Sequence, residues 1–295
     1  MNKLTLLFPA FLRFSSIVVL TLLLPLSSRA EPAMWVVRDA DSTIYIIGTV
    51  HLLRHEMDWN ATKVTKAVSE SSELWLEVAN IEDQSTNLSL VTQYGMDAEK
   101  TLSSKLNEAQ KEKLAKVSQI YGLPTQSVEM MKPWMAGLTF SVLPLLNGGF
   151  DPNAGIDHVL KAQAQKEGDK IFGFETAENQ VRFLADLSEA DQIGFLESSL
   201  DDAVKGTEQL DKLAKAWMDG DTDTIGNLLV NDFKKVAPTV YGKLVVQRNI
   251  AWANKIAEIL KRSGVQQVAV GAAHLAGPDS LQVQLGRRGI KVEKY

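Results

Sequence analysis

The chain has 295 residues, of which 45% are hydrophobic and 23% are charged, and these are ordinary proportions for a packed globular protein. Its net charge of −5 argues against a surface that binds the phosphates of nucleic acids. It contains no cysteine, which excludes disulfides, thiolate ligands and lipid attachment through cysteine, so any metal site must use imidazole and carboxylate groups.

The first thirty residues have the features of a signal peptide. They include basic residues but no acidic one, and their apolar stretch, 17–26, is too short to span a bilayer comfortably as a helix. Ser28 and Ala30 provide the small side chains that signal peptidase accepts before its cleavage site. We therefore predict a cleaved signal peptide over 1–30 and a periplasmic or secreted bacterial domain over 31–295; an uncleaved anchor is the alternative. No later apolar run is long enough to cross a membrane.

The segment after this leader predicts two strands, a helix and a third strand. Residues 34–49 read MWVVRDADSTIYIIGT, in which two β-rich runs around a polar turn predict a hairpin. Residues 58–73 have helical spacing, and 73–80, which read ELWLEVAN, are typical of a short strand. One face of the predicted helix carries three apolar residues, which are Val64, Ala67 and Val68.

The middle of the chain has a mainly helical pattern. A helical tract is predicted from residue 97 to about residue 146, with a break at 122–124, where a glycine and a proline occur. A further helix is predicted at 155–169, and it leads into the strand KIFGFE at 170–175. From 176 to 263 the pattern is helical almost throughout.

The chain closes with an apolar segment, QQVAVGAAH at 266–274, then a helix through Leu281 and Leu285 and a strand within 290–295. Strands are thus expected near both ends and at two interior points, with helices between them. We predict the α+β class, with an α/β-like arrangement: a single domain in which a mixed β-sheet is surrounded by helices, with a large helical middle region. The hairpin at the start makes at least one strand pair antiparallel.

Two of the four histidines occur in the same local sequence, G-x-x-H, at the end of an apolar run. Gly48 precedes His51, and Gly271 precedes His274. Glycine allows a sharp turn and the close approach of another group, and ligands in open sheets bind beyond the carboxyl ends of strands. Two strands of one sheet that end in this way would bring both imidazoles to the same rim. The alternative is that each histidine is a hydrogen-bonded turn residue.

Two carboxylates and one arginine are candidates to join the histidines. Glu77 and Glu175 each stand at the end of a predicted strand, where an unpaired buried charge would be costly. Alternatively, each favours a following helix through its charge, which applies more to Glu175 than to Glu77. Arg248 begins a predicted helix, where it could stabilise an oxyanion, hold a site carboxylate in a bidentate pair, or lie at the surface.

The other two histidines give weaker signals. His55 follows His51 by four residues, but H-L-L-R-H lacks the glutamate of the zinc-protease motif and comes after a strand. His55 and Arg54 are candidates to line the mouth of the site. His158, next to Asp157 in the first turn of a predicted helix, is interpreted as a surface histidine.

Five segments, in this order, resemble the TraB/GumN family: YIIGTVHLL, LWLEVAN, GIDHVLKAQAQKEGDKIFGFETAENQ, RNIAWANKIAEIL and VAVGAAHLAGPDSLQVQLGRRGIKVEKY. The resemblance covers 34–295 and implies a single-domain fold of the erythromycin-esterase/ChaN-like type. The family includes the Tiki ectodomains, membrane-tethered metalloproteases that act on Wnt proteins. Because this chain looks like an exported bacterial protein, that substrate does not carry over. The positions that match the family's site are His51, Glu77, Asp157, Glu175, Arg248 and His274.

The resemblance and the residues together predict a metal-dependent hydrolase, with a peptide or small molecule as substrate. His51 and His274 would ligate a divalent ion, Mn²⁺, Co²⁺ or Zn²⁺, together with a carboxylate, Glu77 or Glu175. The remaining carboxylate would move protons, and Arg248 would stabilise the oxyanion.

Two other functions stay open. The first is a metal-free, esterase-type hydrolase in which His51 activates water and Glu77 orients it. The second is a binding protein that captures a peptide signal or a haem through the same histidines without chemistry. The sequence does not determine the substrate or the oligomeric state.

Overall fold

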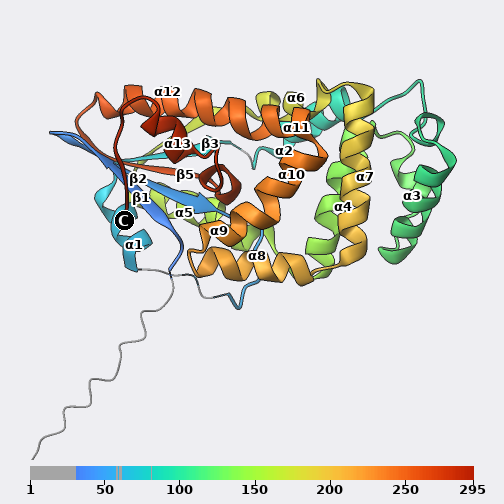
Figure 1. Ribbon diagram of the computed structural model, residues 1–295, viewed down its shortest axis with the longest axis horizontal. Coiled ribbons are helices and arrows are strands. Elements are labelled where there is room, and N and C mark those ends of the chain that lie inside the picture. Colours follow the sequence, from blue (N-terminus) through green and yellow to red (C-terminus); the bar gives the residue numbers. More distant parts are fainter. Residues whose placement is uncertain (1–30, 58, 60–61, 81) are drawn as a thin grey trace, which may run out of the picture.

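The computed structural model describes residues 31–295, except for 58, 60–61 and 81. The predicted signal peptide, 1–30, lies outside the described residues. Within the described part of the chain, no helix is both long and apolar enough to cross a membrane. The predicted α+β class is confirmed, because six strands form one mixed sheet that is surrounded by helices (Figure 1).

The sheet joins an antiparallel part to a parallel part. Its strand order is β4-β3-β5-β2-β1-β6. β1 pairs antiparallel with β2 and with β6, which confirms the predicted hairpin, whereas β2, β5, β3 and β4 run parallel. The strands are β1 (Met34–Arg38), β2 (Ser42–Thr49), β3 (Glu73–Val78), β4 (Lys170–Glu175), β5 (Gly264–Gly271) and β6 (Val292–Lys294).

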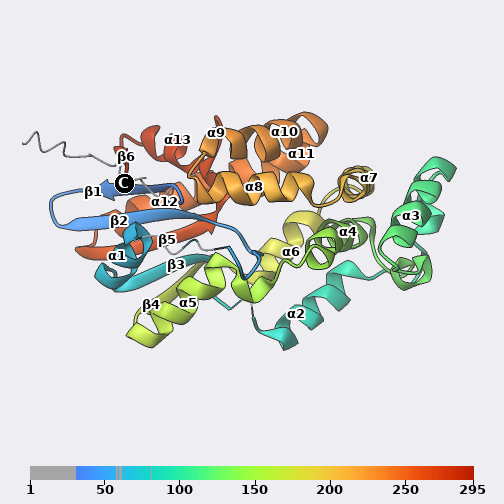
Figure 2. The same cartoon turned by 90° about the horizontal axis from the view of Figure 1, so that it is seen from below.

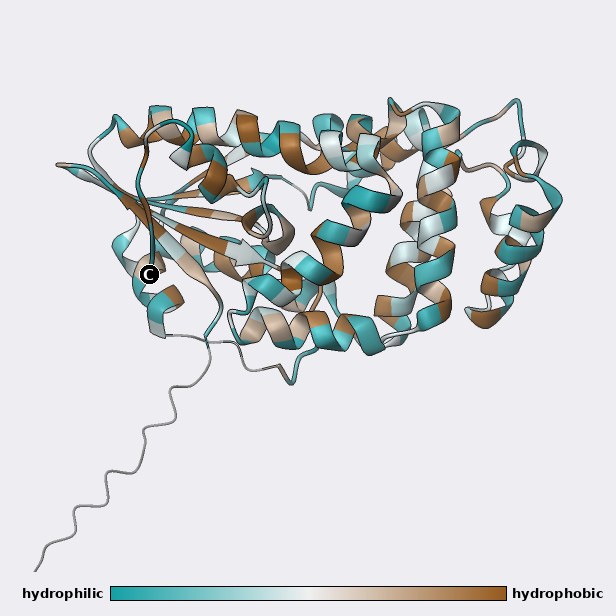
Figure 3. Cartoon of the chain, viewed as in Figure 1, coloured by the Kyte–Doolittle hydropathy of each residue, from teal (hydrophilic) through white to brown (hydrophobic). Residues whose placement is uncertain are grey.

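Apolar layers cover both faces of the sheet, so the central strands are hydrophobic along most of their length (Figure 3). In β2, Tyr45 and Ile47 belong to one layer, and Ile44 and Ile46 belong to the other. The first layer includes α1 (Thr62–Glu70), α5 (Ile156–Glu167), α8 (Glu208–Met218) and α9 (Thr222–Ile225), and the second includes α12 (Arg248–Leu260) and α13 (Leu281–Gly286).

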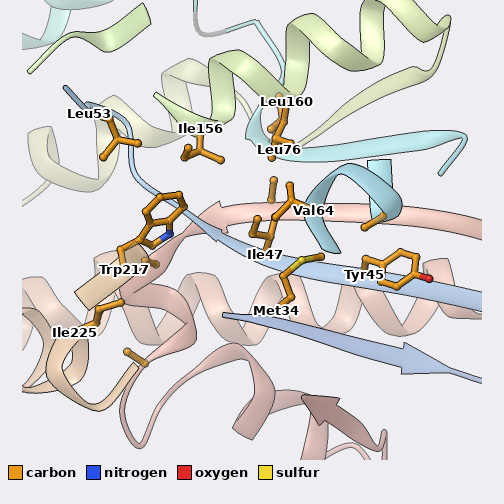
Figure 4. Close-up of a cluster of buried hydrophobic side chains, with 14 of the residues drawn as sticks. Met34, Tyr45, Ile47, Leu53, Val64, Leu76, Ile156, Leu160, Trp217 and Ile225 are labelled. Atoms are coloured by element: carbon orange, nitrogen blue, oxygen red, sulfur yellow. The ribbon is translucent and has the colours of Figure 1, made fainter. Parts of the chain in front are cut away.

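The larger core lies between the sheet and helices α1, α5 and α8 (Figure 4). Val64, Ala67 and Val68 of α1 are buried there, as their spacing predicted. Trp217 of α8 also reaches this core, and its Nε1–H donates to the carbonyl oxygen of Gly48 at 2.8 Å. The packing of α8 therefore holds the end of β2 in place.

The helical middle region extends beyond the sheet and has its own core (Figures 1 and 2). Helices α3 (Glu108–Ile120), α4 (Pro133–Asn147) and α7 (Glu189–Lys205) bury Leu114, Phe140 and Leu196 against one another. The other α-helices are α2 (Gln84–Leu90), α6 (Ala177–Ala185), α10 (Asp232–Val236) and α11 (Pro238–Tyr241). The short 3₁₀ and π segments are η1 (Val91–Gly95), η2 (Ser103–Lys105), η3 (Thr125–Val128), η4 (Pro152–Ala154), η5 (Gly226–Asn231), η6 (Gly242–Gln247) and η7 (Ala272–Leu275).

The predicted helical tract at 97–146 is more divided than its pattern indicated. Asn107 starts α3 through a capping box, and α4 begins only at Pro133, whose fixed φ and missing N–H suit the first helical position. Pro144 lies inside α4, which continues to Asn147. Because proline has no N–H, the helix lacks one i→i−4 hydrogen bond at this position.

Candidate functional site

The two G-x-x-H segments leave the sheet side by side. β2 and β5 are parallel neighbours in a register that pairs Gly48 with Val270 and Thr49 with Gly271. The two strands that precede the G-x-x-H histidines therefore belong to one sheet and end at the same edge. β3 lies next to β5, and β4 lies next to β3, so the carboxyl ends of four parallel strands meet at this edge.

Both motif glycines allow the backbone to approach a neighbour closely. A Cβ at Gly48 would lie 3.1 Å from the Cα of Ala272, in the other motif. A Cβ at Gly271 would lie 3.1 Å from Oε1 of Glu77, which accepts a hydrogen bond from the Gly271 N–H at 2.7 Å. A side chain at either position would crowd the strand ends and move Glu77 or His274.

Arg248 is the centre of a buried polar cluster, and all five of its N–H groups donate hydrogen bonds. Nε donates to Glu175, and Nη2 donates to Glu175 at 2.9 Å and to Oε2 of Glu77 at 2.5 Å. Nη1 donates to the carbonyl oxygen of Leu244 at 3.2 Å and lies 3.1 Å from Nε2 of His274. Arg248 thus holds the site carboxylate Glu175 in a bidentate pair, and it keeps no N–H for an oxyanion.

This cluster carries two negative charges and one positive charge away from water. The side chains of Arg248, Glu77 and Glu175 are 9%, 11% and 9% exposed. Burial raises the pKa of Glu77, but the charge of Arg248, the two histidines and the hydrogen bond from the Gly271 N–H together outweigh burial and lower that pKa to about 2. Glu77 is therefore ionised at neutral pH, and its ion pair with Arg248 is the largest of the contributions that lower its pKa.

His274 is a buried, neutral member of the same cluster. Burial lowers its pKa to about 3. Its Nδ1 lies 2.7 Å from Oδ1 of Asn249, and this contact assigns the proton to Nδ1 and leaves Nε2 as an acceptor for Arg248. Asn249 also donates to the carbonyl oxygens of His274 and Asp279. The ring of Trp252 lies 4.4 Å from the His274 ring, so the imidazole is held on several sides.

His51 is the member of the site that is open to solvent, with 54% of its side chain exposed. Its Nδ1 lies 2.6 Å from Oδ2 of Asp157, in the first turn of α5. The protein atoms packed around the inner part of the ring lower the pKa of His51, but the hydrogen bond and charge of Asp157, with the charge of Glu77, outweigh this desolvation and raise the pKa to about 9. The charges of His51 and Glu77 also act on each other's pKa, so the two groups share one electrostatic environment.

The residues with weaker sequence signals have partners outside this cluster or are exposed. His55 pairs with Asp151 at 2.7 Å, and 70% of its side chain is exposed. Arg54 pairs with Asp211 at 2.7 Å and donates to the carbonyl oxygen of Gly148, so it connects the loop after β2 to α4 and α8. His158 is exposed on α5, as its interpretation as a surface histidine predicted.

Three site residues have contacts that sequence reasoning missed. Asn249 orients His274, and Gln180 of α6 donates to Oε2 of Glu77 at 3.0 Å. Trp252 is buried and donates from Nε1 to Glu175 at 2.9 Å. Asn249 directly follows Arg248 in the chain, and this position beside a candidate site residue is the one sequence feature that could have indicated its role.

The predicted metal ligands, His51 and His274 with a carboxylate, are not arranged around a common position for a divalent ion. Among the residues that the structure describes, no group of three or more His, Cys, Asp or Glu is arranged to hold a metal. Nε2 of His274 already faces the Arg248 guanidinium at 3.1 Å and lies 4.0 Å from Oε1 of Glu77. A cation between His274 and Glu77 would be repelled by the positive charge of Arg248, which contacts both side chains.

Comparison with known proteins agrees with the ordered motifs. The model of the TraB/PrgY/gumN family matches residues 33–294. The chain is 24% identical to the uncharacterised protein YbaP of Escherichia coli K12 over 254 residues, which is 86% of this chain and 92% of YbaP. It is 19% identical to an uncharacterised protein of Treponema pallidum over 271 residues, which is 87% of this chain and 80% of that protein. No solved structure matches significantly. The chain therefore belongs to the TraB/PrgY/gumN family.

Proposed function

We propose that the protein is a hydrolase of esters or amides, peptides included, in which His51 activates water as a general base. The observation that carries this proposal is the His51–Asp157 pair at 2.6 Å, exposed at the rim where the parallel strands end. A carboxylate that accepts from Nδ1–H fixes the tautomer, points Nε2 outward as the base and stabilises the imidazolium that forms on proton transfer.

Glu77 supports this role as the group that orients the attacking water. An ionised carboxylate has about four lone-pair sites, and Glu77 uses three of them for Gly271, Arg248 and Gln180. The remaining site is on Oε1, which accepts only from the Gly271 N–H. A water held there would donate one hydrogen bond to Oε1 of Glu77 and could give its other proton to Nε2 of His51. Arg248 keeps the Glu77 carboxylate ionised and in place.

The pH dependence of hydrolysis tests the base. The neutral imidazole is the active form, so kcat/KM should rise with pH and level off above the pKa of His51, near 9. In Asp157→Asn the charge that raises this pKa is lost, so the rising limb should move toward the ordinary value of about 6.5 while the plateau falls. The measurement is kcat/KM from pH 5 to 10 with an activated aryl ester and a fluorogenic peptide library. If the rising limb of the kcat/KM profile stays at the same pH in Asp157→Asn, His51 is not the general base.

A metal-dependent hydrolase is the second candidate, and one observation favours it. Asp157 and Asn249 each contact Nδ1 of a motif histidine, and carboxylate or carbonyl partners at the far nitrogen are usual for metal-binding imidazoles. The hydrogen bond from Arg248 to His274 and the ion pair between Arg248 and Glu77 oppose it.

We expect hydrolysis to be unchanged after dialysis against a chelator, because the guanidinium of Arg248 occupies the space between the candidate ligands. The measurement is kcat/KM before and after chelation, with elemental analysis of protein loaded separately with Mn²⁺, Co²⁺ and Zn²⁺. His274→Ala serves as the variant that lacks one candidate ligand. Activity that is lost on chelation, with about one ion per chain in the wild type and none in His274→Ala, would establish the metal-dependent function instead.

A further inference from the structure

A cavity of about 640 Å³ lies behind the Glu175–Arg248 pair, between strands β3 and β4 and helices α6 and α12. Its volume is in the range of small-molecule sites, about 300–1,000 Å³. β4 is the edge strand of the sheet, so no further strand closes this side of the cavity in the described part of the chain. The hydrolytic steps proposed above use none of its aromatic residues, which are Trp75, Phe172, Phe174, Phe183 and Trp252.

Four of these rings form a continuous apolar wall, in which the ring centroids of Trp75 and Phe174 lie 5.5 Å apart. Trp75 stacks on Phe172 with ring centroids 4.6 Å apart, and Phe174 stacks on Trp252 at 5.6 Å. The two tryptophans are buried, whereas Phe172, Phe174 and Phe183 are only half-buried, so part of the wall stays open. Such a surface suits a flat apolar group, because aromatic faces bury a large area and prefer stacked or edge-on partners.

The charges around the cavity leave one cation uncompensated. Arg248 is saturated by its hydrogen bonds, and Arg262 forms two hydrogen bonds with Glu73, at 2.7 and 3.2 Å. Lys255 lines the cavity with its ammonium 5.2 Å from the centroid of Trp75, and it has no carboxylate partner in the described part of the chain. The one carboxylate in the lining, Glu175, is paired with Arg248 and accepts a hydrogen bond from Trp252.

We propose that this cavity binds a flat apolar group, of about the size of an aromatic ring, that carries a negative charge. The ring packs on the aromatic wall and the anionic group pairs with Lys255. Trp252 forms part of this wall and also contacts His274 at 4.4 Å between ring centroids, so the occupant lies directly behind the buried cluster. If the hydrolase proposed above acts on such a molecule, this cavity selects its anionic, apolar end, a role that rests on the proposed function.

Two probes of the same ring size and opposite charge test the cavity. Isothermal titration of the purified protein should show saturable one-to-one binding of 3-phenylpropionate, roughly fivefold tighter than binding of 2-phenylethylammonium, as an exposed charge pair contributes. Lys255→Glu should reverse this preference. The matched control is Lys261→Glu, which makes the same charge change at an exposed position at the end of α12 that does not line the cavity. This control should keep the wild-type preference.

A second variant tests the location of the site by filling the cavity. Ala251 is exposed on α12 and lines the cavity, so Ala251→Trp should weaken binding of 3-phenylpropionate at least tenfold without unfolding the protein. No saturable binding in the wild type, unchanged binding in Ala251→Trp, or the same preference in Lys255→Glu and Lys261→Glu would overturn the proposal. Because the readout is binding and not turnover, failure here leaves the role of His51 standing. Intact binding in a protein without hydrolytic activity would reject the proposed function alone.

Discussion

Replacing His51 by alanine is expected to lower kcat/KM for ester or peptide hydrolysis by about 10²–10⁴-fold, which is the usual contribution of a positioned general base. The fold should be unaffected, because more than half of the His51 side chain is exposed and its hydrogen bond is to Asp157, at the surface of α5. The measurement is kcat/KM with the aryl ester and the peptide library, together with the urea midpoint of each variant.

The chain contains a matched control for this variant. His55 lies four residues further along the same loop, and it also pairs with an aspartate, Asp151, at 2.7 Å. Because His55 is outside the cluster at the strand ends, His55→Ala should keep wild-type activity within about twofold, since surface substitutions have small effects. Equal losses in both variants would mean that the loop, and not the imidazole of His51, is what matters. Full activity in His51→Ala would reject the base assignment.

The second large effect concerns stability. Arg248→Ala would leave Glu77 and Glu175 buried without their cation, and breaking a buried ion pair in this way costs about 3–5 kcal/mol. The free energy of unfolding in urea at pH 7 should fall by that amount. Arg248→Lys keeps the charge but not the planar, bidentate geometry, so we expect an intermediate loss. This variant also provides a measurement if Arg248→Ala does not fold.

An exposed arginine with similar hydrogen bonds is the control for stability. Arg262 donates from both terminal nitrogens to Glu73, but 45% of its side chain is exposed. Solvent screens this pair, so Arg262→Ala should cost less than about 1 kcal/mol. The destabilisation of Arg248→Ala should also shrink as the pH falls from 7 toward 4.5, because burial raises the pKa of a carboxylate that has lost its cation, and protonation in this range removes the buried charge. A loss that stays the same over this range would mean that lost packing, and not buried charge, is responsible.

The local sequence determined the elements and the strand ends. The β-rich runs around a polar turn correctly predicted the hairpin, and the spacing of Val64, Ala67 and Val68 correctly predicted the buried face of α1. The repeated G-x-x-H segments correctly predicted that two strands end together. These features depend on backbone preferences and on the periodicity of apolar residues, both of which are encoded within a few neighbouring positions. The start of α4 at Pro133 was missed, because the only break predicted was at 122–124, and the chain has a second break just before Pro133.

Only the tertiary structure decided what the site residues do for one another. The sequence presented Glu77, Glu175 and Arg248 as separate candidates, because Arg248 is 73 positions from Glu175 and 171 positions from Glu77. Folding joins them in one buried cluster, which uses every donor of Arg248 and removes it as a source of oxyanion stabilisation. The opposite charge states of His51 and His274 arise in the same way, because one imidazole gains Asp157 and the other loses water. The type of each residue is local information, whereas its pKa, its hydrogen-bond partners and its remaining donors depend on which distant segments pack against it.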